Sequence, residues 1–250
     1  MRSGAGLALP GIPILHPGWR LISGMISLLL AFTLWWLWHD AAYRVNEVIL
    51  QGAQRVTPQD VMTLIPVRGT PIFAVDVALL AEQVRQAFPE FYQPEVRIGL
   101  PGKVIIHAVE RQPVLRWEQG EKALWVDMNG VGFPPRGESA PAVTIRAETA
   151  PAAPEKSISP AQILPSELVV AILQVSYLAP QSAPLVYTGE HGLGWQDPNG
   201  WQVYFGHDVH DIEEKLYLYA SIAAYLQEND LHPAFVSLEY PQAPYYRLIP

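Results

Sequence analysis

The longest hydrophobic stretch of the chain lies near its N-terminus. Residues 21–38, which begin at Leu21 and end at Trp38, include no charged side chain. As a helix this stretch would be about 27 Å long, close to the roughly 30 Å hydrocarbon core of a bilayer. Unpaired backbone groups are costly in lipid, so a helix is the expected conformation. The pattern predicts one transmembrane helix over residues 21–39, which anchors the chain in the lipid bilayer.

The residues on either side of this stretch predict its orientation. Arg2 and Arg20 precede it without an acidic residue, whereas Asp40 follows it. Positive charge favours the cytoplasmic side. We therefore expect residues 1–20 to form a cytoplasmic tail and everything from about Tyr43 onward to be extracytoplasmic. The alternative is a cleaved signal peptide, which is disfavoured because the residues before a cut would not be small.

Beyond the anchor, the pattern changes to short strands and amphipathic helices. Alternating apolar positions predict strands at residues 45–50, 96–100 and 104–111. Between the first two strands, Thr57 and Asp60 are spaced as a capping box for one helix, and Asp76 is a suitable N-cap for another. The order strand, helix, helix, strand, strand predicts an α+β unit with both helices on one face of a three-stranded sheet.

From Val114 onward the pattern predicts a second, mixed β unit with flanking helices. Ser166 and Asp208 are the expected N-caps of its two helices, and Ala, Pro, Glu, Lys and Ser at residues 147–160 predict a flexible loop. The expected strands are residues 114–118, 123–127, 141–145, 193–196, 201–205 and 235–240, followed by a further short strand near 245–248.

The first of these units resembles the POTRA domain of FtsQ/DivIB-type bacterial cell-division proteins. The resemblance rests on the order of elements, on the Pro-Gly-Lys-Val turn at residues 101–104 and on the Glu-Arg-Gln-Pro-Val segment at residues 110–114. The turn at residues 89–94 departs from the family pattern. The resemblance implies a POTRA domain over residues 43–113 and an FtsQ-type β domain over residues 114–250.

Without the resemblance, Glu110 and Arg111 predict only a solvated ion pair at a strand end. Pro113 has no N–H group for a sheet ladder, so we expect the chain to leave the first sheet there.

The resemblance also implies a function. FtsQ-type proteins are non-enzymatic scaffolds that support septum formation, and they bind FtsB, FtsL and other membrane proteins of the divisome at the cell membrane of the division septum. A strand with a free edge accepts a partner by β-augmentation. We expect this edge at residues 235–240, and the alternative is that the strand simply completes the sheet. The expected partner-binding residues are Phe235, Val236, Ser237, Leu238, Glu239, Tyr240 and Tyr246.

Composition argues against several other functions. The chain has no Cys, a net charge of −8 and a pI near 5.3, which disfavours thiol chemistry and a nucleic-acid partner. His207, His210 and Glu214 are a weak candidate for a metal site in an anchored hydrolase, and the spacing of a zinc protease is missing. We therefore predict no catalytic residue, metal or cofactor. A POTRA-containing membrane-anchored chaperone or assembly factor for protein export is the second functional hypothesis.

Overall fold

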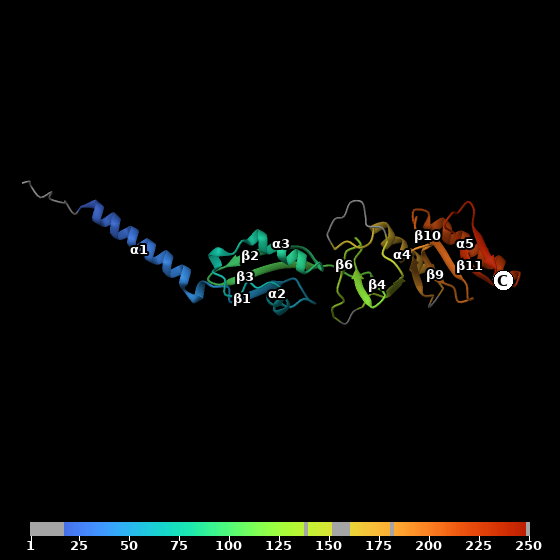
Figure 1. The fold of residues 1–250 in the computed structure, drawn as a ribbon, viewed down its shortest axis with the longest axis horizontal. Helices are drawn as coiled ribbons and strands as arrows, with labels where there is room; N and C mark the ends of the chain where they lie inside the picture. The colour runs from blue at the N-terminus through green and yellow to red at the C-terminus, as the bar shows by residue number, and fades with distance from the viewer. Residues whose placement is uncertain (1–17, 138–139, 152–160, 181–182, 249–250) are drawn as a thin grey trace, which may run out of the picture.

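The computed structural model describes residues 18–137, 140–151, 161–180 and 183–248. Figure 1 shows three parts that follow one another along the long axis: the helix α1, a unit built on β1 to β3, and a unit built on a larger sheet. Both units combine helices with a sheet of mixed parallel and antiparallel strands, which confirms the predicted α+β class.

The first part is a single apolar helix, α1 (Trp19–His39). Among the described residues it is the one helix long and apolar enough to cross a membrane, and none of its residues is buried within the protein. It spans the predicted transmembrane stretch and is consistent with a single-pass membrane protein. Most of the predicted cytoplasmic tail, residues 1–17, lies outside the described residues.

The connection from α1 to the first unit is short and packed. Asp40 accepts a hydrogen bond from Ala42 N over 2.8 Å at the start of a 3₁₀ turn, Ala41–Tyr43. Arg44 Nη1 then donates to Gly69 O over 2.9 Å. A side chain at Gly102 would place its Cβ 2.3 Å from Arg44 O, so only glycine lets the β2–β3 turn approach this closely. The connection is therefore held against the sheet.

The first sheet has the strand order β1 (Glu47–Gln51), β3 (Lys103–Glu110), β2 (Phe91–Gly99). β1 pairs parallel with β3, and β2 pairs antiparallel with it. Alternate side chains of β3 are buried against the helices α2 (Pro58–Leu64) and α3 (Val77–Ala87), whereas Val109 on the opposite face is exposed. The strand, helix, helix, strand, strand order is the predicted one.

Local signals account for both helices of this unit. Thr57 and Asp60 form the predicted capping box, and the Asp76 side chain accepts hydrogen bonds from two backbone N–H groups of the first turn of α3. The start of β2 was predicted too late. It begins at Phe91, and a bulge between Tyr92 and Glu95 interrupts its pairing.

The second sheet has nine strands in the order β12-β11-β10-β9-β8-β7-β4-β5-β6. The pairs β4/β7, β7/β8 and β10/β11 are parallel, and the other pairs are antiparallel. The strands are β4 (Leu115–Gln119), β5 (Lys122–Val126), β6 (Gly132–Phe133), β7 (Val143–Ala147), β8 (Leu185–Thr188), β9 (Gly192–Gln196), β10 (Gln202–Gly206), β11 (Pro233–Ser237) and β12 (Tyr245–Leu248).

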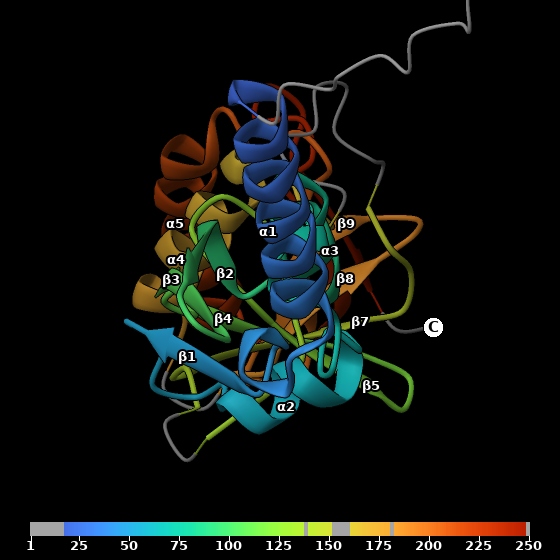
Figure 2. The same ribbon diagram turned by 90° about the vertical axis from the view of Figure 1, so that its left-hand side faces the viewer.

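Two helices pack on this sheet, α4 (Ser166–Leu178) and α5 (Ile212–Glu228). Viewed from the α1 end, they lie together on one side of the second unit (Figure 2). Their buried residues join the apolar face of the sheet in one core, which includes Trp195, Trp201 and Phe205. This core holds the far end of the molecule together.

Several boundaries in this unit differ from the prediction. Ser166 is the first helical residue and Pro165 is the N-cap, whereas Asp211, not Asp208, is the N-cap of α5. Asp208 instead accepts a hydrogen bond from His210 N, in a turn before the helix. β8 was not predicted. The loop expected at residues 147–160 begins one residue later than predicted, because Ala147 is the last residue of β7. Residues 152–160 of this loop lie outside the described residues.

A buried carboxylate joins the end of β3 to the loop after β1. Glu110 accepts hydrogen bonds from the backbone N–H groups of Gln54, Arg55 and Val56, and Arg55 Nε donates to its second oxygen over 2.8 Å. Burial alone would raise the pKa of Glu110, but the hydrogen bonds from Arg55 and the backbone outweigh it and lower the pKa. The prediction of a solvated pair was wrong, because these partners lie far away in the sequence.

Arg111 completes the connection to the second unit. Its Nη1 lies 2.7 Å from Asp127 Oδ2, just beyond β5, and its Nε donates to Pro89 O. Nearby, Arg136 Nε is 3.1 Å from the buried Glu90. We call this set of ion pairs, Glu110–Arg55, Arg111–Asp127 and Arg136–Glu90, the joint. Arg111–Asp127 and Arg136–Glu90 cross the boundary and couple the two units through charge, whereas Glu110–Arg55 fixes the end of the first unit beside them.

Candidate partner-binding site

The candidate binding site lies at the far end of the nine-stranded sheet, where the prediction placed a free edge on residues 235–240. In the structure β11 is not an edge. It pairs parallel with β10 on one side and antiparallel with β12 on the other. The edge was placed one strand too early, because the short segment from Tyr245 onward adds a further strand. At this end of the sheet the terminal strand is β12.

The predicted contact residues divide between the sheet interior and the surface. Val236, Ser237 and Leu238 are buried, so their side chains are not available to a partner. Phe235 and Glu239 are partly buried, and Tyr240 and Tyr246 are exposed. A partner-binding role for these residues stays a prediction.

β12 is exposed along its whole length. All four of its side chains are exposed, and Tyr245, Tyr246 and Leu248 are large and apolar or aromatic, with exposed fractions of 49%, 38% and 50%. An exposed hydrophobic edge strand pairs readily with another chain unless charge or bulges prevent it. Arg247 is the one charged residue in β12.

The other terminal strands of the two sheets are less suited to accept a partner. β6 has two residues, both buried. β2 is interrupted by its bulge and exposes the ion pair Glu95–Arg97. At the ends of β1, Glu47 and Gln51 are exposed and polar. Among the described strands, β12 therefore combines a free edge with exposed aromatic side chains.

A groove lies beside this edge. A hollow of about 240 Å³ between α5 and β12 is lined by Ser221, Ile222, Tyr225, Pro244, Tyr245 and Tyr246. Tyr246 pairs in register with the buried Val236, so it projects from the same face of the sheet as the core. A side chain of an added strand would find an apolar hollow next to the main-chain edge. The α5 residues of this hollow were not predicted, since a helical face gives no sign of the strand beside it.

An aromatic row covers the opposite face of the same strands. The rings of Tyr204 and Phe235 lie 5.9 Å apart, and those of Phe235 and Tyr245 lie 5.8 Å apart. His191 stacks on Tyr204, and its Nδ1 is 2.8 Å from Glu239 Oε1. These cross-strand contacts hold β11 and β12 in register.

Lys215 fixes the turn that leads into α5. Its Nζ is buried and donates to Phe205 O and Asp208 O, over 2.7 Å each. Burial lowers the pKa of Lys215, and the carboxylates of Asp208, Asp211 and Glu239 partly oppose this effect. Lys215 thus ties α5 to the end of β10 and positions the helix beside the C-terminal strands.

In the structure the side chains of the candidate metal site, His207 and His210, each contact another partner. His207 Nδ1 lies 3.2 Å from the Tyr187 hydroxyl, and His210 Nδ1 is 2.7 Å from Asp208. Among the described residues, no three His, Asp or Glu side chains are placed to hold a metal ion.

Comparison with known proteins agrees with this architecture. The sequence profile of the POTRA domain, FtsQ-type, matches residues 43–111. The chain is 26% identical to the cell division protein FtsQ of Chloroflexus aurantiacus over 94% of this chain and 88% of that protein. It is 26% identical to FtsQ of Chloroflexus aggregans over 64% of this chain and 67% of the relative. It is 32% identical to FtsQ of Streptomyces venezuelae over 47% of this chain and 44% of that protein.

Proposed function

The chain is an FtsQ/DivIB-type cell-division protein, and from this premise we propose that it is a non-enzymatic scaffold of the divisome. In this proposal α1 anchors it in the cell membrane with the N-terminus in the cytoplasm, and the two folded units act outside the cytoplasm at the division septum. Arg20 before the helix and Asp40 after it support that orientation.

The proposed scaffold binds FtsB- and FtsL-like membrane-anchored division proteins through the free edge of β12. The single observation behind this assignment is the edge itself, which offers exposed aromatic side chains next to an apolar hollow. Main-chain hydrogen bonds to an added strand would supply affinity, and alternate side chains such as Tyr246 and Leu248 would supply specificity. The FtsB-like protein is the proposed occupant of this edge.

Copurification of the full chain with coexpressed FtsB- and FtsL-like proteins tests the edge. The variant Tyr246→Asp with Leu248→Asp introduces charge where the added strand would pack, and it should lower recovery of the FtsB-like protein at least tenfold. Leu79→Asp is the control, because Leu79 is also an exposed apolar side chain but lies on α3 in the other unit. Undiminished recovery with the β12 variant would remove the edge from the proposal.

Depletion of the protein tests the cellular role. We expect depleted cells to form filaments and a tagged copy to collect at midcell. Normal division after complete depletion would contradict a role as a divisome scaffold, whatever happens to the β12 variant.

A further inference from the structure

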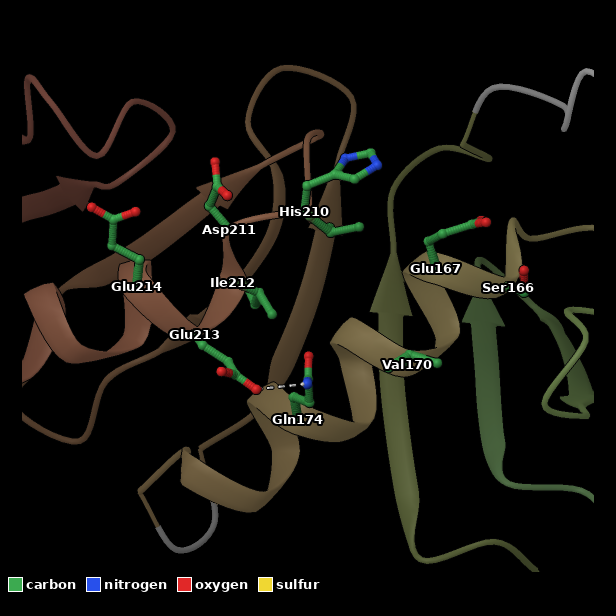
Figure 3. Close-up of a pocket in the computed structure, with 10 residues that line it drawn as sticks. Ser166, Glu167, Val170, Gln174, His210, Asp211, Ile212, Glu213 and Glu214 are labelled. Atoms are coloured by element: carbon green, nitrogen blue, oxygen red, sulfur yellow. Dashed lines mark hydrogen bonds between the residues drawn. The ribbon is translucent and has the colours of Figure 1, made fainter.

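A second groove lies between α4 and α5, and its lining shares no residue with the hollow beside β12. It consists of two hollows of about 620 and 570 Å³ that meet at Gln174 and Glu213. Figure 3 shows the first hollow, with Glu213 of α5 reaching Gln174 of α4 across 3.4 Å. The groove thus runs from the first turns of both helices toward the end of α4.

The first hollow is acidic. Glu167, Asp211, Glu213 and Glu214 line it, and the described residues that line the two hollows include no Lys or Arg. His210, also in the lining, is held by Asp208, and this hydrogen bond raises the pKa of His210.

The nearest basic side chain of α5 does not offset this charge. Lys215 points inward, to Phe205 O and Asp208 O. The carboxylates at this end of the groove therefore have no Lys or Arg beside them among the described lining residues, and His210 is held by Asp208.

The second hollow is lined largely by apolar and aromatic side chains, and several of these are highly exposed. Tyr177, Tyr217 and Leu178 are 88%, 78% and 58% exposed, and the hollow between them reaches down to the buried Trp195 and Leu216. Contiguous exposed aromatic side chains around a hollow are typical of a protein-binding surface. α4 has 13 residues, so the groove beside it is about 20 Å long, the length of three to four helical turns.

We propose that this groove binds a basic amphipathic helix of a partner protein. The apolar side of that helix would pack between Tyr177 and Tyr217, and its Lys or Arg side chains would lie against Glu167, Glu213 and Glu214. Charge complementarity selects this occupant, since an acidic helix would be repelled at one end of the groove. A membrane surface is a poor occupant, because α1 lies at the opposite end of the molecule (Figure 1).

Binding of a synthetic helix to the full chain in nanodiscs of zwitterionic lipid tests the proposal. The probe is a fluorescent peptide of about 14 residues, the length of four helical turns, with Leu on one face and Lys on the other. A second peptide has Glu in place of every Lys. The Lys peptide should bind saturably and at least tenfold more tightly than the Glu peptide, and added salt should weaken it.

Variants locate the binding. Glu167→Lys with Glu213→Lys should weaken binding of the Lys peptide at least tenfold. Tyr217→Ala should weaken its binding severalfold without changing the salt dependence. The matched control is Glu121→Lys with Glu228→Lys, two exposed carboxylates outside the groove, which makes the same change in net charge. Equal weakening by the control pair, or equal binding of the two peptides, would overturn the proposal. Circular dichroism of each variant confirms that it is folded.

Discussion

The joint lies at the boundary between the two units and the β12 edge lies at one end of the second sheet, and the two regions use their polar groups in opposite ways. In the joint, the Glu110 carboxylate is occupied by three backbone N–H groups and Arg55, and Arg111 is occupied by Asp127. At β12, one side of the backbone pairs with β11 and the other side pairs with no described strand. The joint satisfies its polar groups internally, whereas the edge has backbone groups that an added strand would pair with in the proposed function.

This difference separates two kinds of residue that the sequence alone does not distinguish. A charged residue of the joint acts on stability, because its removal leaves buried groups unpaired. In the proposed function an aromatic residue of the edge would act on association, because its side chain is exposed in the free protein. The predictions below test this division, beginning with the largest effect.

Glu110→Ala should destabilise the folded protein most. It removes the shared acceptor of three backbone N–H groups and leaves Arg55 partly buried without its partner, at a cost of about 3–5 kcal/mol. Urea denaturation followed by circular dichroism measures the loss. Glu82→Ala, which breaks an exposed pair with Arg85, is the control and should leave the midpoint unchanged. A small effect of Glu110→Ala would mean that the joint is not structural.

Lys215→Met should have the next largest effect. Methionine fills a similar volume but leaves Phe205 O and Asp208 O without their donor, at a cost of about 1–3 kcal/mol. The same denaturation experiment measures it. Because this change also loosens α5 beside β12, Lys215→Met should lower both the stability and the recovery of the FtsB-like protein. Glu110→Ala, in contrast, should leave that recovery unchanged under conditions where the variant is folded. A more stable Lys215→Met protein would show that burial of the ammonium outweighs its hydrogen bonds.

Acid should weaken the joint through Glu110. Its pKa in the folded protein is below its ordinary value of 4.5, so its contribution is complete above pH 4.5 and is lost as the pH falls through the lowered pKa. Glu90 acts in the opposite sense: burial raises its pKa, so its contribution declines as the pH rises above 4.5. The urea midpoint should fall on acidification, and Glu110→Gln should flatten that fall. An unchanged slope in Glu110→Gln would assign the acid sensitivity to other groups.

The smallest effect on stability is expected from the edge. Leu248→Asp changes a half-exposed side chain of β12, so the free energy of unfolding should change by about 0.5 kcal/mol or less. Its effect should appear in copurification instead. A large loss of stability in this variant would show that β12 is part of the stable core of the sheet. It would contradict the expectation that edge residues affect association and not stability.

The parts of the fold that depend on neighbouring residues were predictable from the sequence. The Thr57–Asp60 capping box and the Asp76 cap are formed as expected, because each signal and its target lie within one helical turn. The alternation in β3 likewise predicted its buried face. β8 was missed, although its four β-branched, aromatic and aliphatic residues between Pro184 and Gly189 are a strand signal, because the segment is short.

The candidate site depended on longer-range information. Glu110 finds its partners more than 50 positions earlier in the chain, so its role cannot be derived from the residues beside it. Similarly, residues 235–240 have the pattern of a terminal strand, and only the pairing of β12 with β11 shows that they lie one strand inside the edge. Local alternation predicts which face of a strand is buried, but not how many strands lie beyond it.

The packed connection at Arg44 and Gly102 has a geometric consequence. The three parts follow one another along the long axis of the molecule (Figure 1), with Arg44 bonded to Gly69 after the first part and Arg111 paired with Asp127 between the second and the third. If α1 anchors the protein as proposed, the POTRA unit is the part next to the membrane and the β12 edge belongs to the unit farther from it. In the proposed function, a partner anchored in the same membrane would reach that edge only if its own segment outside the membrane spans this distance, so the length of that segment would help to select the partner.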